Sequence, residues 1–319
     1  MPYVPAGVIP AVLLPFNDDL SIDEGSYRSH LRDVAAVEGV SAITVNAHAS
    51  EVASCTFDEQ RRVLEISREA LGTLPIVNGV YADGSLEAAR IAKMAAAGGA
   101  SALLVFPPNI YYFGQRAEMA LAHFKRIADA TDLPLIAFQY PIAGGYGYPM
   151  STLMRIVDEV PSVRAIKDWC ANAQLHERHI RVLQSRQRPV NVLSTHSSWL
   201  LSSLVLGCAG LLSGSGSVIA ELQARLFRAV RDGSLDEARE IHARITPTVD
   251  VFYAEPWVDM HNRMKEALVL LGRLPRAVVR PPLVKLAPPE IERIRAALLA
   301  AGLLETKTPS QRRETSWVS

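Results

Sequence analysis

A lysine stands at the end of residues 162–169 (SVRAIKDW), a run that otherwise suits a buried strand. Strand alternation places Val163, Ala165 and Lys167 on one face, where the small neighbours leave the lysine room in a cavity. Removal from water disfavours the charged ammonium form and lowers its pKa. A neutral amine attacks carbonyl carbon, so Lys167 has the chemistry needed to form a Schiff base. The alternative is a lysine that begins the next loop, with its ammonium group in solvent.

Imidazole, phenol and hydroxyl groups follow other apolar runs of the chain. His48 follows one run, Tyr140 another, and Thr195 and His196 a third. If these runs are parallel strands of one barrel, their carboxyl ends meet at one face, and the groups gather around Lys167. The other lysines of the chain do not stand at the end of such a run. We therefore expect Lys167 to be the nucleophile of an active site.

The elements that would position these groups repeat along the chain. A short apolar run, a turn and an amphipathic stretch recur eight times, which is the pattern of βα units with buried parallel strands. Eight units favour a closed barrel, so the expected fold class is α/β, a (β/α)8 TIM barrel with a C-terminal helical extension. An open α/β sheet with a helical cap is the alternative architecture. The runs are residues 7–16, 40–47, 75–81, 100–107, 134–141, 162–169, 189–195 and 209–216.

Helical patterns separate the runs and continue beyond the eighth. Possible capping boxes at residues 21–24 and 56–59 predict two helix starts. We expect a catalytic barrel over residues 1–231 and a C-terminal helical extension over 232–304. The polar segment 305–319 is expected to be a flexible tail. The helical patterns after the last run lie near residues 218–231, 235–245, 255–272 and 288–301.

The charge balance argues against a polyanionic partner. The 319 residues include 33 basic and 33 acidic side chains, so no net field attracts nucleic acid or an anionic membrane. No apolar run reaches the ~18 residues that span a bilayer. Residues 8–16 are broken by prolines, which suits a first strand and not a signal peptide. Cys55, Cys170 and Cys208 lack zinc-site spacing and are interpreted as reduced thiols, so a soluble, cytoplasmic protein is expected.

Several segments together resemble the dihydrodipicolinate synthase/N-acetylneuraminate lyase family of (β/α)8 Schiff-base enzymes. The resemblance runs from about Val8 to Leu304 and rests on the order and spacing of these segments. It implies that Lys167 forms an imine with the keto group of pyruvate or of another 2-keto acid. The protonated imine then accepts electrons during carbon–carbon cleavage or formation, or during elimination. The segments are residues 7–16 (GVIPAVLLPF), Ser50-Glu51 followed by 57–61 (FDEQR), 138–141 (FQYP), 165–168 (AIKD) and Glu255-Pro256.

The chain departs from this family where the substrate is usually held. The family's carboxylate-binding loop usually reads Gly-Thr-Thr-Gly-Glu, whereas residues 47–51 read AHASE, so two hydroxyls are lost and an imidazole is gained. His48 is expected to be a base or substrate contact, or else a loop histidine bound to a backbone carbonyl. The family's proton-shuttling tyrosine falls at Phe138, and Tyr140 on the same strand face either replaces it or only packs. Residues 142–146 lack the arginine with which dihydrodipicolinate synthase binds a second carboxylate, so lysine biosynthesis is not expected.

The residues and the resemblance together define a candidate site. Its catalytic residues are Lys167, Tyr140 and Tyr112, the last because it matches a region whose tyrosine, in relatives, reaches a neighbouring subunit. No metal and no cofactor are expected, and the resemblance implies a homodimer or homotetramer. The expected substrate-binding residues are His48, Ala49, Ser50, Phe138, Thr195, His196, Leu212 and Ser213.

The expected function is that of a class I (Schiff-base) lyase or aldolase that acts on a 2-keto acid and releases or uses pyruvate. A dehydratase or deaminase of a 2-keto-3-deoxy or related acid, working through the same imine, is the alternative. Two rivals belong to other classes. A metal-dependent aldolase would take its ligands from His48, Glu51, Asp168 and His196. A non-catalytic sensor would bind keto or amino acids without turnover.

Overall fold

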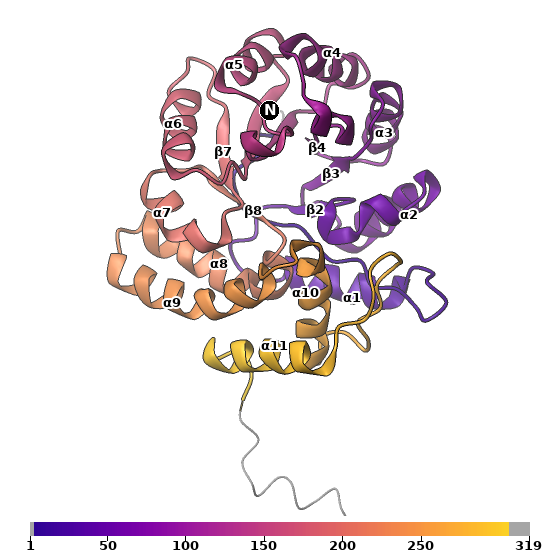
Figure 1. Cartoon of the computed structure of the whole chain (residues 1–319), viewed down its shortest axis with the longest axis vertical. Coiled ribbons are helices and arrows are strands. Elements are labelled where there is room, and N and C mark those ends of the chain that lie inside the picture. The colour runs from indigo at the N-terminus through magenta and orange to yellow at the C-terminus, as the bar shows by residue number, and fades with distance from the viewer. Residues whose placement is uncertain (1–2, 306–319) are drawn as a thin grey trace, which may run out of the picture.

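The computed structural model describes residues 3–305, in which eight parallel strands form one sheet that curves into a barrel (Figure 1). Neighbouring strands follow the order β1-β8-β7-β6-β5-β4-β3-β2. Parallel bridges from Val8 to Val40 and from Ala11 to Thr44 join the first strand to the second and close the ring. The expected barrel is confirmed, and the open-sheet alternative is wrong. The strands are β1 (Gly7–Pro10), β2 (Ile43–Val45), β3 (Ile76–Val80), β4 (Ala102–Val105), β5 (Leu135–Gln139), β6 (Val163–Asp168), β7 (Asn191–Ser194) and β8 (Gly210–Ser213).

The strands are buried on both faces, as strands between a barrel core and an outer ring of helices must be. Every residue of β3 and of β5 is buried. Gly79 in β3 is required by a close approach, because a Cβ atom there would lie 1.9 Å from the carbonyl oxygen of Asn46. Asn46 follows β2 directly, so this glycine lets the loop that begins at Ala47 lie against the third strand.

Helices alternate with the strands and continue past β8. The capping box expected at Thr56 and Glu59 is present, with both reciprocal hydrogen bonds. The box expected at residues 21–24 is wrong, because Asp23 caps the first helix through the N–H of Ser26 while Ser21 bonds to Asp19. The α-helices are α1 (Glu24–Ala35), α2 (Phe57–Leu71), α3 (Ser85–Ala97), α4 (Ala117–Ala128), α5 (Met150–Glu159), α6 (Ala173–Gln184), α7 (Leu200–Val205), α8 (Gly216–Arg231), α9 (Leu235–Phe252), α10 (Met260–Leu270) and α11 (Pro288–Ala300).

The last three helices gather on one side of the barrel, beside α8 (Figure 1). The buried Arg263 of α10 lies 2.7 Å from the carboxylate of Glu290 on α11, which joins the two helices. The start of α10 reaches the carboxyl ends of the strands. The extension therefore contributes to the barrel mouth as well as to its side.

Two expectations concern the ends of the chain and the bilayer. The expected tail at residues 305–319 lies, apart from Glu305, outside the described residues. No helix within residues 3–305 combines the length and the hydropathy that a bilayer-spanning helix requires.

Candidate active site

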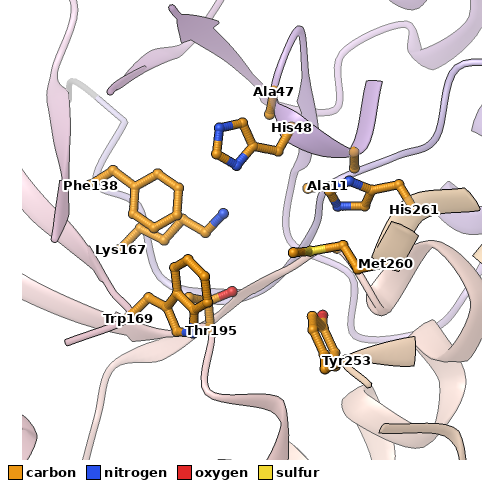
Figure 2. Close-up of a pocket in the computed structure, with 12 residues that line it drawn as sticks. Ala11, Ala47, His48, Phe138, Lys167, Trp169, Thr195, Tyr253, Met260 and His261 are labelled. Carbon is orange, nitrogen blue, oxygen red and sulfur yellow. The ribbon is translucent and has the colours of Figure 1, made fainter. Parts of the chain in front are cut away.

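A narrow cavity lies at the carboxyl ends of the strands, where the extension meets the barrel. Figure 2 shows that its walls come from the strand ends on one side and from the extension on the other. Five residues of the expected site line it, which confirms that the strand ends converge here. The lining residues are Ala11, Ala47, His48, Ala49, Phe138, Lys167, Trp169, Thr195, Gly214, Tyr253, Met260 and His261.

Lys167 projects into this cavity from the carboxyl end of β6 (Figure 2). The residue is only 6% exposed, and burial lowers the pKa of its amine to about 7. Its Nζ atom lies 4.0 Å from the centroid of the Phe138 ring. A substantial fraction of the amine is therefore neutral at physiological pH, as a nucleophile requires.

Asp168 follows Lys167 in sequence, but its side chain turns to the other face of β6, toward α6. Its Oδ2 atom accepts hydrogen bonds from Nδ1 of His176 at 2.8 Å and from Nδ1 of His179 at 2.7 Å. Burial by itself would raise the pKa of Asp168, yet these two hydrogen bonds hold it far below its usual range. The ionised carboxylate thus fixes the end of β6 from behind and leaves the cavity to Lys167.

His48 and Tyr140 meet beside the cavity, which His48 lines and Tyr140 does not. The hydroxyl of Tyr140 lies 3.2 Å from Nε2 of His48. Burial, followed by the nearby charge of Lys167, lowers the pKa of His48 to about 3, so its imidazole is neutral. Burial raises the pKa of the Tyr140 phenol well above its usual value. A neutral phenol and a neutral imidazole in hydrogen-bond contact can pass a proton between them.

Phe138 lies beside both this pair and the lysine. Its ring centroid is 4.3 Å from that of Tyr140 and 6.0 Å from that of His48. The ring has no hydroxyl and therefore supplies only an apolar wall beside the amine. The expectation that Phe138 lines the substrate site agrees with its position.

Some residues of the loop after β2 line the cavity, and others point into the protein interior. His48 and Ala49 line the cavity in the 3₁₀ helix η1 (His48–Ser50). Ser50 turns away, because its hydroxyl donates to the carbonyl of Val12 at 3.0 Å. Glu51 forms an ion pair with the buried Lys265 of α10. Of the expected binding residues in this loop, the structure brings His48 and Ala49 to Lys167, and not Ser50.

The end of β7 shows a similar division. Thr195 lines the cavity, whereas His196 stacks on Trp199 with ring centroids 4.3 Å apart. Burial lowers the pKa of His196 to about 4, and its Nε2 atom lies 3.9 Å from Sγ of Cys170. The structure therefore places His196 behind the cavity wall, in the packing between β6 and β7.

At the end of β8, the cavity is lined by Gly214 and not by the side chains of Leu212 and Ser213 that were expected there. Leu212 is fully buried, and Ser213 shares a hydrogen bond of 2.9 Å with Ser215. Gly214 lines the cavity in their place, and an added Cβ atom there would lie 3.2 Å from Nε2 of His261. Leu212 and Ser213 thus support the wall from outside.

Tyr112 lies away from the cavity of its own chain. It is 66% exposed in the 3₁₀ helix η3 (Asn109–Phe113), where its ring contacts Phe113 and Tyr146. Tyr111, in contrast, is buried. A catalytic role for Tyr112 remains a prediction that requires a second subunit.

The extension supplies wall residues that sequence reasoning missed. Met260 and His261 begin α10, and Tyr253 follows α9. Burial, together with the charges of His48, Lys167 and Lys265, lowers the pKa of His261 well below its usual value. His261 and Lys265 stand four residues apart and so share a helix face. The helix also carries Asn262, Arg263 and Glu266, so this spacing alone did not single out His261 in the sequence.

Of the four ligands of the metal-dependent aldolase hypothesis, Asp168 and His196 come together within residues 3–305, and His48 and Glu51 do not join them. Glu51 forms an ion pair with Lys265, whereas Asp168 is hydrogen-bonded to His176 and His179. A different group has ligand atoms within 4.8 Å of one another, namely Asp168, Cys170, His176 and His196. These side chains could hold a divalent ion, but they lie outside the cavity wall, and Asp168 already bonds two imidazoles.

A family comparison agrees with this geometry. Residues 4–301 match the model of the dihydrodipicolinate synthetase family. A 4-hydroxy-tetrahydrodipicolinate synthase from Gluconacetobacter diazotrophicus is 31% identical over 300 residues, which cover 93% of this chain and 97% of that protein. The enzyme of the same name from Rhodopseudomonas palustris is 31% identical over 302 residues, with the same coverage.

Solved structures show the same fold. Dihydrodipicolinate synthase from Thermotoga maritima superposes with a TM-score of 0.87 at 25% identity, over 95% of this chain and all of that one. A monomeric dihydrodipicolinate synthase variant gives a TM-score of 0.86, also at 25% identity, over 94% of this chain and 97% of the variant. The agreement spans barrel and extension together.

Proposed function

The chain belongs to the dihydrodipicolinate synthetase family of lyases, and from this premise we propose that Lys167 forms a Schiff base with a 2-keto acid. In this proposal the enzyme is a class I aldolase that releases or uses pyruvate. The observation that carries it is a buried amine with a pKa of about 7 in the cavity at the barrel mouth. Such an amine has both the protonation state and the location that imine formation needs.

The reaction runs through Nζ of Lys167. Attack of the neutral amine on C2 of the substrate expels the keto oxygen as water and forms a protonated imine. When the C4 hydroxyl loses its proton, the C3–C4 bond breaks, C4 leaves as an aldehyde, and the electron pair enters the imine to give an enamine. Protonation at C3 and hydrolysis of the imine release pyruvate and the free amine. The reverse order of steps forms the bond.

Tyr140 and His48 are proposed to move the protons. Phe138 cannot do so, since it lacks a hydroxyl, whereas Tyr140 lies on the same strand face and contacts His48 at 3.2 Å. The phenol relays the proton of the substrate hydroxyl to the imidazole as the C3–C4 bond breaks, so the imidazolium exists only transiently, and the same relay returns the proton to C3 of the enamine. The pair thus stands where the family's shuttle tyrosine would otherwise act.

The substrate carboxylate is proposed to bind at the loop after β2. The backbone N–H groups of His48 and Ala49 begin η1 and have no backbone acceptor within residues 3–305. Both residues line the cavity, and Thr195 offers a hydroxyl from β7. Hydrogen bonds to a carboxylate from N–H and O–H groups are charge-assisted and stronger than neutral ones.

Lysine biosynthesis is not part of this proposal, although the relatives bear the name 4-hydroxy-tetrahydrodipicolinate synthase. Residues 142–146 contain no arginine for a second carboxylate. The cavity wall has one basic residue besides histidine, and that residue is Lys167 itself. A dicarboxylate product would leave one charge unpaired in a buried site, which is costly.

Elimination from the same imine is the second candidate. The Tyr140–His48 pair can protonate a leaving hydroxyl as readily as it accepts a proton from one. A dehydratase of a 2-keto-3-deoxy acid would retain the carbon chain, whereas an aldolase releases pyruvate. Product analysis by NMR therefore separates the two.

Exchange of the pyruvate methyl protons in D₂O tests the proposed function. Enamine formation at Lys167 makes these protons exchangeable, so the enzyme should catalyse their replacement by deuterium, as read by NMR. Lys167→Ala should abolish the exchange, while the surface variant Lys125→Ala should retain it. Absence of catalysed exchange, together with thermal stabilisation by pyruvate, would support the sensor hypothesis instead.

A homodimer or homotetramer completes the proposal. The family resemblance implies it, and the exposed Tyr112 and Phe113 offer an aromatic contact surface next to the barrel mouth. Light scattering at micromolar concentration should give a mass of two or four times 34.8 kDa. If the protein is a monomer and still catalyses the exchange, Tyr112 is not part of the active site.

A further inference from the structure

A second, larger chamber opens from the Lys167 cavity. It is open to solvent and shares His48, Trp169, Met260 and His261 with the inner cavity. A substrate held at Lys167 can therefore extend into it without leaving the protein. The chamber is lined further by Glu51, Val52, Ala53, Ser54, Trp257, Val258, Arg280, Pro281, Pro282 and Leu283.

Aromatic rings form a continuous row from the lysine to this chamber. Phe138 contacts Nζ of Lys167, and its ring centroid lies 4.3 Å from that of Tyr140. Tyr140 is followed by Trp169 at 5.6 Å, and Trp169 by Trp257 at 5.5 Å. Figure 2 shows Phe138 and Trp169 on the same side of the cavity as Lys167. Rings at these spacings present faces and edges to which a planar apolar group can stack.

The charges in the chamber wall are already paired. Glu51 binds Lys265 and accepts the N–H of Arg280 at 3.0 Å. The Arg280 guanidinium is bound by both carboxylate oxygens of Glu59 and by the carbonyls of Leu20 and Ser54. No other charged residue lines the chamber in the described part of the chain. A substrate carboxylate, phosphate or ammonium group would therefore find no free partner there.

Two apolar side chains at the chamber rim are exposed to solvent and would be buried by a bound ligand. Trp257 is 45% exposed and Val258 63% exposed, although both stand beside a cavity that leads to a reactive amine. Apolar side chains held open at a binding cleft gain free energy when a ligand covers them. Continuity with the Lys167 cavity identifies that ligand as the distal part of the substrate.

We propose that the outer chamber binds the C4 substituent of the substrate and that this substituent is an apolar aryl group. The proposal rests on the Schiff-base function of Lys167 and narrows it. The substrate class is then the 4-aryl-4-hydroxy-2-oxobutanoates. Cleavage of their C3–C4 bond yields an aromatic aldehyde and pyruvate, with the C4 hydroxyl proton passing to the Tyr140–His48 pair. No oxidant or further reactant is required.

Competing aldehyde acceptors test this proposal in the direction of synthesis. The wild-type enzyme is given pyruvate with benzaldehyde, with glyceraldehyde or with succinic semialdehyde, and the products are quantified by mass spectrometry. The expected result is a preference in kcat/KM of at least about tenfold for benzaldehyde over both polar aldehydes. Equal use of all three, or a preference for succinic semialdehyde, would overturn the assignment of an aryl site.

Two variants connect the preference to the chamber. Trp257→Ala should lower kcat/KM for benzaldehyde about tenfold and lower kcat/KM for glyceraldehyde less. Val284→Ala is the matched control, since Val284 is 72% exposed on the neighbouring segment and does not line the chamber. If Trp257→Ala instead changes the mass in light scattering and spares benzaldehyde, the rim is a subunit contact and the proposal is wrong.

The exchange assay keeps the two proposals separate. Exchange without an aryl preference refutes the aryl chamber and leaves the Schiff-base function intact. Absence of exchange in the wild-type enzyme refutes the Schiff-base function itself. The proposal of an aryl-binding chamber is then refuted as well, because it rests on that function.

Discussion

At the scale of single residues, burial decides which groups in the cavity carry charge. Burial alone lowers the pKa of Lys167 to about 7, because no acidic side chain within residues 3–305 opposes the shift. His48 is neutral because its pKa falls to about 3. Between pH 5 and pH 9, Lys167 is therefore the group of this pair that titrates.

The rate of imine formation should follow the neutral fraction of Lys167. Because the neutral amine reacts, the rate with pyruvate should rise about tenfold per pH unit below pH 7 and level off above it. Rapid-quench reduction of the imine measures this rate. A midpoint near 10.5, the ordinary value for lysine, would show that the amine is solvated and the cavity description wrong.

The same burial should cost stability. The folded pKa of about 7 lies below 10.5, the ordinary value for lysine, so the folded state binds fewer protons than the unfolded state between these pH values. The penalty is complete below pH 7 and shrinks as the pH rises toward 10.5. Lys167→Met should therefore raise the free energy of unfolding at pH 6 by ~3 kcal/mol, and by less at pH 10. Urea unfolding at the two pH values measures this, and an equal effect at both would contradict it.

Tyr140 should carry the proton transfer that Phe138 cannot. Tyr140→Phe removes the hydroxyl that lies 3.2 Å from His48 and should lower kcat by about 10²–10⁴-fold. Imine formation with pyruvate should persist, because Lys167 is untouched. Phe138→Tyr is the comparison variant, and its turnover should stay near the wild-type value. Loss of imine formation in Tyr140→Phe would assign Tyr140 to binding and not to proton transfer.

At the scale of elements, one buried ion pair joins the loop after β2 to α10. Glu51 has a left-handed backbone with φ of 50° and pairs with Lys265, which is fully buried. Burial lowers the pKa of Lys265, while the charge of Glu51 and the hydrogen bond to it oppose that shift. The pair therefore fixes where His48 and His261 stand relative to each other.

Removal of one partner should cost more than removal of both. Glu51→Gln leaves Lys265 charged and buried and should lower the free energy of unfolding by about 3–5 kcal/mol. The double variant Glu51→Leu with Lys265→Met should recover much of this loss. Chemical denaturation of the two single variants and the double variant measures the coupling. Additive losses would mean that the pair does not act as a unit.

Strand ends were predictable from the sequence, and the walls that face them were not. Alternation along β6 placed Lys167 in the cavity, the end of the seventh run indicated Thr195, and the family resemblance indicated Phe138. Side chains alternate between the two faces only within a strand. Alternation therefore could not predict that Ala49 and Thr195 line the cavity while Ser50 and His196 do not. A helical pattern reveals which face is buried but not which part of the barrel covers it. Met260 and His261 therefore appeared only in the structure.

At the scale of the whole molecule, the extension is part of the candidate active site and not an appendage. It supplies Tyr253, Met260 and His261 to the inner cavity and Trp257 to the outer chamber. The barrel supplies the proposed nucleophile, Lys167. Substrate selectivity in the extension and chemistry in the barrel can therefore vary separately, as loop variation on this fold generally permits.

Mixed oligomers should reveal whether Tyr112 serves a neighbouring site. Lys167→Ala and Tyr112→Ala subunits, each impaired alone, are unfolded, mixed and refolded together. If Tyr112 reaches across an interface, some sites in the mixture combine an intact Lys167 with a partner's intact Tyr112, and activity returns. If the mixture remains as inactive as its parents, Tyr112 does not act across an interface.

Borohydride reduction in the presence of pyruvate tests the central claim most directly. Reduction converts an imine into a stable amine, and peptide mass mapping then locates the modified residue. We predict one pyruvyl adduct per chain, on the peptide that contains Lys167, and none in Lys167→Ala. An unmodified Lys167, or an adduct on another lysine, would contradict the account of this protein as a Schiff-base lyase that acts through Lys167.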